Sequence, residues 1–394
     1  MRWIEHAELD FAFQDIHDDR RTRDTGSTIE TRERNRDRTY SFDAEASSAI
    51  GDWSSWTYGL ETTLDRVASR ARDRDVVTGE PFAARSRFAD GSKLDSYAIF
   101  LQGEVEPHPR WTVTAGGRGS WFEIDIARAD RGIGVERSIS DGTWSFGLVY
   151  HLMPELNLVG NVGRGFRVPN VFDLSALGPR PGNRFNVPSP SLGPESVLGA
   201  DIGAKLRTSR ATAELFLFRS EIDDKIRDFP TGATTPEGRQ IVFAANLDRV
   251  LLYGVEVGGR IHPTDETEIM ASLTYTYGEE ELPDGREVPA DLVPPLQGQL
   301  GALAHVLPTV TIDAFVRYAG SQTRLSDEDR TDPRIDPDGT DAWFTLNAGI
   351  EWRVHSALTA RLRVENILDR AYREHGSGID GPGINAIAAL DARF

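Results

Sequence analysis

The feature that most constrains this chain is an alternation of apolar and polar residues with a period of two, repeated in segment after segment. Successive side chains of a β-strand point to opposite faces, so each such segment presents one apolar and one polar face. The pattern is clear in 267–277, 310–318 and 358–365. We expect the apolar faces to contact lipid, and they carry Leu358, Leu362, Val364, Ile269, Leu273, Tyr275, Ile312, Val316, Leu390 and Phe394. We expect the polar faces to line a lumen, and they carry Arg361, Arg363, Glu365, Asp313 and Arg317.

The alternation predicts about sixteen strands with boundaries uncertain by two to four residues. No stripe with a period of 3.6 residues is long enough for a structural helix, so no helix longer than about two turns is expected. The segment 239–262 is unusually long and has room for two strands. The predicted strands are 2–16, 36–48, 53–67, 93–106, 109–127, 139–152, 155–167, 195–208, 210–227, 239–262, 266–280, 296–307, 309–325, 341–354, 357–371 and 383–394.

The connections between these strands alternate strictly between short and long. A membrane barrel has short periplasmic turns and longer extracellular loops, which accounts for this alternation. The chain is therefore predicted to be all-β, a single antiparallel transmembrane β-barrel over residues 1–394, with both termini on the periplasmic side. The long connections fall at 17–35, 68–92, 128–138, 168–194, 228–238, 281–295, 326–340 and 372–382.

Composition agrees with a barrel and excludes several other classes. Hydrophobic residues make up only 39% of the chain, which suits strands with a polar lumen face. No stretch approaches the 18 apolar residues of a membrane-spanning helix. The net charge of −18 argues against nucleic acid as a partner, and the absence of Cys excludes disulfides and thiol chemistry. A soluble all-β binding protein ranks last, because the many polar strand faces would be hard to bury.

Several motifs in residues 160–394 resemble those of the TonB-dependent outer-membrane receptors. Residues 165–174, GFRVPNVFDL, are similar to a box at the end of a strand that enters a long loop, and 191–196, SLGPES, to the segment that opens the next strand. Residues 246–256 are similar to an Asn followed by Gly-Val-Glu, and 365–378 to the motif of the penultimate strand. The terminal Phe resembles the signal read by the barrel assembly machinery. Structural roles are expected for Gly165, Phe166, Arg167, Pro169, Pro194, Glu195, Gly254, Glu256, Asn366, Asp369, Tyr372 and Phe394.

The resemblance implies the barrel portion of a monomeric receptor in the bacterial outer membrane that takes up a scarce nutrient, of the ferric siderophore, haem or cobalamin class. It also implies that the plug, through which such receptors contact TonB, and about six of roughly 22 strands are absent, because residue 1 already lies in strand pattern. Alone, this chain is then expected not to perform TonB-driven uptake. A passive porin-like channel and a non-functional receptor fragment are the alternatives. We expect the two edge strands, 3–13 and 384–394, to pair and close a smaller barrel.

The sequence offers few candidate ligand-binding residues. Arg164 and Arg167 could reach the lumen or pair with barrel acids, and the second interpretation is favoured. His375, in the last long loop, is a candidate loop ligand. Asp327, Asp329 and Asp336 crowd one acidic loop that could supply oxygens to Ca²⁺, although a solvated loop is the likelier interpretation. No cofactor is otherwise expected, and no catalytic motif is found, so no enzyme is predicted.

Overall fold

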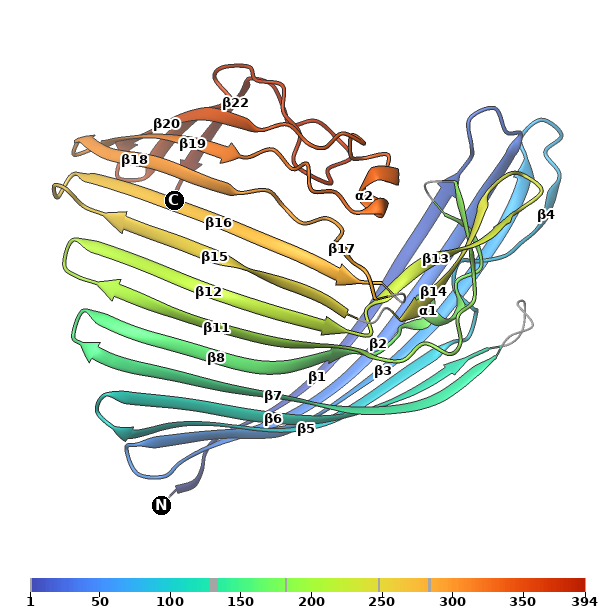
Figure 1. Cartoon of the computed structure of the whole chain (residues 1–394), viewed down its shortest axis with the longest axis horizontal. Coiled ribbons are helices and arrows are strands. Elements are labelled where there is room, and N and C mark those ends of the chain that lie inside the picture. Colours follow the sequence, from blue (N-terminus) through green and yellow to red (C-terminus); the bar gives the residue numbers. More distant parts are fainter. Residues whose placement is uncertain (1, 128–133, 181–182, 247–248, 283–284, 394) are drawn as a thin grey trace. The chain divides into compact units, whose positions relative to one another are not determined.

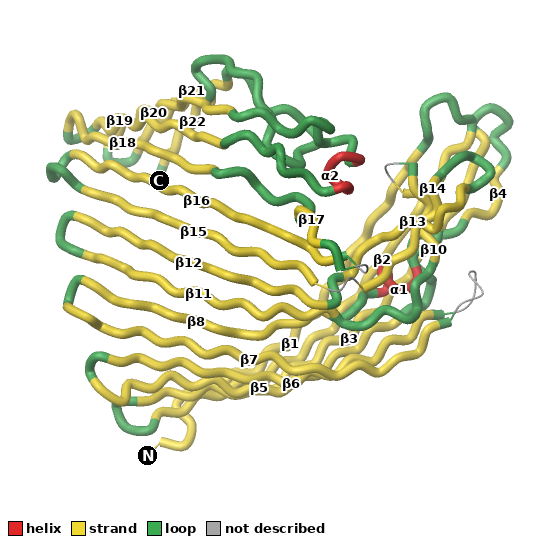
Figure 2. The backbone as a smooth tube through the Cα atoms, viewed as in Figure 1, coloured by secondary structure: helices red, strands yellow, loops and turns green. Residues whose placement is uncertain are grey.

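The computed structural model describes residues 2–127, 134–180, 183–246, 249–282 and 285–393. The chain divides into two compact units, each described by itself below. The first comprises Met1–Gly147, Val162–Leu198 and Ile222–Arg249, and the second Leu148–Asn161, Gly199–Glu221 and Val250–Phe394. Strands dominate both units (Figure 2), as the period-2 pattern predicts.

Among the described residues, eighteen strands belong to one large sheet and four to a small one. Apart from the short strands β4 (Pro81–Ala84) and β17 (Glu287–Pro289), the large sheet has the predicted number of members (Figure 1). These are β1 (Arg2–Thr22), β2 (Ile29–Ala49), β3 (Ser54–Asp75), β5 (Lys93–His108), β6 (Trp111–Ile126), β7 (Val135–Met153), β8 (Leu156–Arg167), β11 (Glu195–Arg207), β12 (Ala211–Asp223), β15 (Arg249–Ile261), β16 (Thr267–Glu281), β18 (Gln297–Leu307), β19 (Val310–Ala319), β20 (Trp343–His355), β21 (Leu358–Glu365) and β22 (Asn385–Ala392).

In the first unit, β1, β2, β3, β5 and β6 pair antiparallel in that order. The predicted loop 17–35 is wrong, because β1 runs to Thr22 and β2 starts at Ile29. The predicted loop 68–92 is too long as well, since β3 runs to Asp75. Hydrophobicity does not mark these extensions, because charged side chains fill both of their faces.

A small sheet of β9 (Gly178–Arg180), β10 (Arg184–Val187), β13 (Ile226–Thr234) and β14 (Gln240–Asn246) forms in the long connections of the first unit. Its pair β10–β14 is parallel. The predicted strand 239–262 is thus two strands, β14 and β15, as its length allowed. The main buried cluster of this unit includes Ile124, Ile126, Leu174 and Leu192, and it fixes the loop 168–194 against β6.

In the second unit, β16, β18, β19, β20, β21 and β22 pair antiparallel in succession. The expected apolar faces are exposed to the surroundings at Ile269, Leu273, Tyr275, Ile312, Leu362 and Leu390. Leu358, Val316 and Val364 are half-buried, and Phe394 lies outside the described residues. Exposed apolar rows are anomalous for a water-soluble protein and are expected of a lipid-facing surface.

The opposite faces of these strands carry ion pairs. Arg363 lies 3.5 Å from Asp313 across the sheet, and Arg361 Nε donates to Glu351 at 2.6 Å. The period-2 separation of apolar and charged faces is therefore confirmed. Closure through the two edge strands stays a prediction.

Helices are short in the described part of the chain. Both α1 (Val171–Ser175) and α2 (Asp327–Thr331) have five residues, within the predicted limit of two turns. None of the helices in the described residues has the length and apolarity needed to cross a membrane.

Candidate functional site

Arg167, at the end of β8, ties the loop 168–194 to its neighbours. Its guanidinium donates to Glu195 Oε1 at 2.6 Å and to Asp173 Oδ2 at 2.7 Å. Glu195 also accepts the backbone N–H of Ile226 at 2.8 Å. Two carboxylates and one guanidinium thus join the end of β8, helix α1 and the start of β11. Arg167 thus pairs with acids of the chain in this structure, and a role in ligand binding stays a prediction.

Helix α1 and Asn246 complete this loop base. Asn170 and Asp173 form a capping box, which satisfies two backbone donors at the start of α1. Asn246 accepts from Gly193 N at 2.9 Å and donates to Gly193 O and to Asp224 O. The amide of Asn246 therefore joins the segment 191–196 to the end of β14. Motifs separated by about fifty residues in the sequence are structural partners here.

The other residues of these motifs are also held by packing. Phe166 meets Phe122 edge to face at 6.0 Å, Pro169 is fully buried, and a Cβ on Gly165 would lie 3.3 Å from Val197. Pro194 precedes Glu195 and is half-buried. In the second unit, a Cβ on Gly254 would meet Tyr275 O at 2.0 Å, so no side chain fits there, whereas Glu256 is exposed.

Arg164 is engaged with the barrel wall. Its guanidinium donates to Asp141 Oδ1 at 2.7 Å and to Gly142 O at 2.6 Å. Arg164 thus also pairs with an acid of the chain, and a role in ligand binding stays a prediction.

In the second unit, Asn366 fixes the last long loop. This residue is 2% exposed and has a left-handed backbone with φ of 47°. Its side chain accepts from Arg370 N and donates to Arg370 O and Pro382 O, at 2.8 to 3.0 Å. One amide thus closes both ends of the segment 366–382.

Asp369 and Tyr372 support the same loop. Asp369 Oδ1 accepts the N–H of Ile384 at 3.0 Å. The ring of Tyr372 lies 4.6 Å from that of Trp343, and a Cβ on Gly381 would collide with it at 2.1 Å. Asn366, Asp369 and Tyr372 of the motif 365–378 therefore build the base of this loop.

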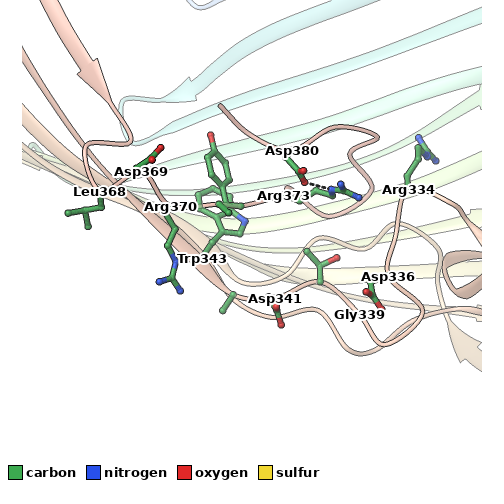
Figure 3. A pocket seen from close by; sticks show the side chains of 14 residues that line it. Arg334, Asp336, Gly339, Asp341, Trp343, Leu368, Asp369, Arg370, Arg373 and Asp380 are labelled. Atoms are coloured by element: carbon green, nitrogen blue, oxygen red, sulfur yellow. Dashed lines mark hydrogen bonds and ion pairs between the residues drawn. The ribbon is translucent and has the colours of Figure 1, made fainter. Parts of the chain in front are cut away.

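A pocket of about 910 Å³ lies where the loops 326–342 and 366–382 meet (Figure 3). Trp343 and Tyr372 provide an aromatic wall. Charged groups come from both loops, and Arg373 Nε donates to Asp380 Oδ1 at 2.7 Å. The sequence did not predict this pocket, since its lining is contributed by two separate loops. The charged residues that line it are Arg334, Arg370, Arg373, Asp336, Asp341, Asp369 and Asp380.

His375, the loop residue proposed as a ligand, does not line this pocket. Its Nδ1 lies 2.9 Å from Thr340 Oγ1, and its buried Nε2 has no hydrogen-bond partner. Burial lowers the pKa of His375, and the Asp329 carboxylate opposes that shift. A half-buried, neutral imidazole between the two loops is a packing residue in this structure.

Carboxylates of the acidic loop 326–340 accept backbone N–H groups of this loop and of a neighbouring one. Asp329 caps α2 by accepting Ser326 N and also accepts Leu292 N at 3.0 Å. Asp336 accepts Asp338 N at 2.9 Å. Across the residues that the structure describes, no group of three His or acidic side chains could hold a metal ion. Asp327, Asp329 and Asp336 thus do not form a metal-binding group in the part of the chain that the structure describes.

Exposed apolar strand faces, ion-paired polar faces and motif networks at the loop bases define an outer-membrane β-barrel. The family described as "TonB dependent receptor-like, beta-barrel" matches residues 2–367. The chain belongs to this family of TonB-dependent receptors and is a protein of the bacterial outer membrane.

Sequence and structure comparisons agree with this assignment. The chain is 25% identical over 284 residues to the vitamin B12 transporter BtuB of Vibrio vulnificus, which covers 69% of the chain and 41% of that protein. Its fold matches the copper transporter OprC with a TM-score of 0.81 at 17% identity, covering 98% of the chain and 62% of OprC. The ferric citrate transporter FecA matches with a TM-score of 0.72 at 18% identity, covering 98% of the chain and 57% of FecA. The chain thus spans less than two thirds of these relatives.

Proposed function

We propose that this barrel forms part of an energised receptor that imports one scarce, bulky nutrient, of the ferric siderophore, haem or cobalamin class. The observation that carries the proposal is the pocket of about 910 Å³ between two loops that are fixed at their bases. Pockets that bind small ligands usually have volumes of 300–1,000 Å³. The volume of the pocket supports a ligand as large as a metal chelate.

The lining chemistry supports the same class of ligand. Arg334, Arg370 and Arg373 offer guanidinium groups that bind carboxylate or phenolate oxygens in a bidentate manner. Trp343 and Tyr372 offer ring faces for stacking. The names of the relatives include vitamin B12, copper and ferric citrate, so they support a transport role without singling out one substrate.

Energised transport requires partners beyond the barrel. We propose that a plug domain occupies the lumen in the working receptor and that TonB acts on that plug. Outer-membrane lipid surrounds the strands, the barrel assembly machinery inserts them, and the receptor works as a monomer without a resident cofactor or an enzymatic step.

An uptake assay tests this proposal. The chain is produced behind a plug domain in cells that lack other receptors, and uptake of labelled cyanocobalamin, haem and a panel of ferric siderophores is measured with and without TonB. We expect one substrate to enter only when TonB is present, and the chain without a plug to give no such uptake. Entry of small solutes independent of TonB would instead show a passive pore.

A pocket variant tests the binding site. Arg370→Gln with Arg373→Gln removes two lining charges, and Arg353→Gln, on an exposed position of β20, is the matched control. We expect the uptake KM to rise at least tenfold in the double variant only. An unchanged KM would show that the substrate does not use this pocket.

A further inference from the structure

The strands β1, β2 and β3 are much longer than a bilayer requires. They have 21, 21 and 22 residues, whereas a tilted strand crosses the hydrocarbon layer with about 9–11. Figure 1 shows them as long blue strands that extend to the β4 hairpin. Their exposed apolar face ends in two aromatic pairs, Phe11–Phe42 at 4.8 Å and Phe13–Tyr40 at 5.1 Å between ring centroids. Such aromatic pairs mark the edge of the apolar belt.

Beyond the aromatic pairs, the same face of the three strands becomes basic. In register, Arg38 lies between Asp15 and Arg66, and Arg34 lies between Asp19 and Arg70. The row of Arg21 places three arginines side by side, Arg21, Arg32 and Arg72, and the register partners Glu30 and Arg74 lie one row farther from the belt. We call this part of the surface the outer basic face. It is defined by the arginines Arg21, Arg32, Arg34, Arg36, Arg38, Arg66, Arg70 and Arg72.

The opposite face of the same extension is mainly acidic. It carries Glu33, Asp37, Asp65 and Asp73, and hydroxyl groups satisfy two of these carboxylates at 2.6 Å. Arg20 and Asp18 also lie on that face. Alternation along the strands thus separates charge by sign. A hairpin that only needed to be soluble would gain nothing from such a separation, since mixed signs on each face would solvate it equally well.

Neutralisation of the outer basic face is incomplete. Asp19 accepts from Arg32 at 2.9 Å and from Arg34 at 3.3 Å, so one carboxylate serves two guanidiniums. Arg70 is 85% exposed and reaches Asp90 only at 3.9 Å. Within the described ranges, Arg21 and Arg72 form no ion pair. Arg36 and Arg66 are paired with Asp15 and Asp95. The arginines of the face still outnumber the carboxylates that they contact, and in a chain with a net charge of −18 this local excess of positive charge indicates an anionic ligand.

The height of the face indicates what kind of anion it contacts. The strand from Phe13 to Arg21 rises about 27 Å, which is about 19 Å along the membrane normal at a tilt of about 45°. The headgroup layer of an ordinary bilayer adds only about 5–7 Å per leaflet. A phospholipid head would therefore contact the rows of Arg38 and Arg36 and leave those of Arg34 and Arg32 unused.

We propose that the outer basic face binds the phosphorylated sugar head of a glycolipid in the outer leaflet of the membrane. The outer basic face continues the apolar belt, which favours a membrane lipid over a soluble anion. Acyl chains that lie on Phe11 and Phe42 would place the attached headgroup on the arginines. Guanidinium groups bind phosphate with two parallel hydrogen bonds, and the four rows match phosphates carried at several heights.

Binding of fluorescent lipopolysaccharide to the full chain in neutral detergent tests the proposal. The variant Arg34→Gln, Arg70→Gln, Arg72→Gln is expected to raise the Kd at least tenfold. The corresponding Arg→Lys triple variant keeps the charge and is expected to stay within about threefold. A control with Arg→Gln at Arg110, Arg207 and Arg353, exposed positions elsewhere, is also expected to stay within threefold.

Competition identifies the source of the phosphate. Phosphatidylglycerol and inorganic phosphate are expected to displace the probe at least tenfold less well than unlabelled lipopolysaccharide at equal phosphorus concentration. Equal displacement by inorganic phosphate or by phosphatidylglycerol would overturn the glycolipid assignment. An unchanged Kd in the Arg→Gln triple variant would also overturn the proposal. So would an equal increase of the Kd in the control variant. If the triple variant does not fold, the single variant Arg72→Gln provides the test. Its Kd for lipopolysaccharide is expected to rise about threefold, and an unchanged Kd would contradict the proposal.

Discussion

Replacement of Asn366 tests the loop base most sharply, because the side chain is buried and its contacts are few and defined. Asn366→Ala removes three hydrogen bonds at 2.8 to 3.0 Å. Each contributes about 1 kcal/mol net. Alanine must also adopt the left-handed backbone at φ of 47°, which costs about 1 kcal/mol more. The loop 366–382 should therefore lose about 4 kcal/mol of local stability.

Asn366→Gly separates these two contributions. Glycine loses the same hydrogen bonds but adopts a positive φ without strain, so the expected loss is about 3 kcal/mol. Glycine at this position should thus be less harmful than alanine, which is the reverse of their usual order.

Hydrogen exchange of the folded protein measures both effects. The amide of Gly381, which donates to Tyr372 O at 2.8 Å, reports on opening of the loop. Its protection should fall by about 1,000-fold in Asn366→Ala, or to the rate of an unstructured peptide if the loop opens fully. Amides of β16 should be unaffected. Protection of Gly381 within threefold of the unsubstituted chain would refute the role assigned to Asn366.

Three further predictions concern other parts of the chain. Arg167→Met leaves Glu195 and Asp173 without their shared cation. Because the guanidinium is 43% exposed, we expect the loop 168–194 to lose only about 1–2 kcal/mol of local stability, measured as faster proteolysis within this loop. Burial lowers the pKa of His375, so the loop has its full stability above a pH of about 6.5 and loses part of it as the pH falls through the lowered pKa. The protection of loop amides, relative to an unstructured peptide at the same pH, should fall when the pH is lowered from 7 to 5, but not in His375→Gln. Leu362→Arg places a charge on the exposed apolar face. Near the bilayer centre this should lower the free energy of unfolding by about 2–4 kcal/mol, measured by urea unfolding from liposomes. At a solvent-facing site the free energy of unfolding would be almost unchanged.

The period-2 pattern predicted most strands, because lipid on one side and polar groups on the other force hydrophobicity to alternate. It failed where both sides are polar. In the outer part of β2, Arg32, Arg34, Arg36 and Arg38 alternate with acidic or amide residues, and the outer part of β1 is equally polar, so neither segment shows a hydrophobic period. Opposite charges at consecutive positions, such as Glu33 and Arg34, fall on opposite faces of a strand. This alternation of charge was the signal that could have revealed the strand.

The loop bases were partly predictable and the pocket was not. Family motifs pointed to Arg167, Glu195 and Asn366, and in the structure these residues form hydrogen bonds at the loop bases. The pocket depends on contacts between loops whose spacing no periodicity fixes. Arg373 lies within the motif 365–378 and Trp343 at the start of β20, and no sequence signal indicated that they line one pocket.

The most direct test of a lipid-facing barrel is the accessibility of single cysteines along β16, since the chain has no native Cys. Spin labels are attached at 269–275, one site at a time, in reconstituted membranes, and their collisions with oxygen and with a water-soluble nickel complex are compared. The account predicts an alternation, with Ile269, Leu273 and Tyr275 accessible to oxygen and with Met270, Ser272 and Thr274 accessible to nickel. Equal access to nickel at all of these positions would contradict it.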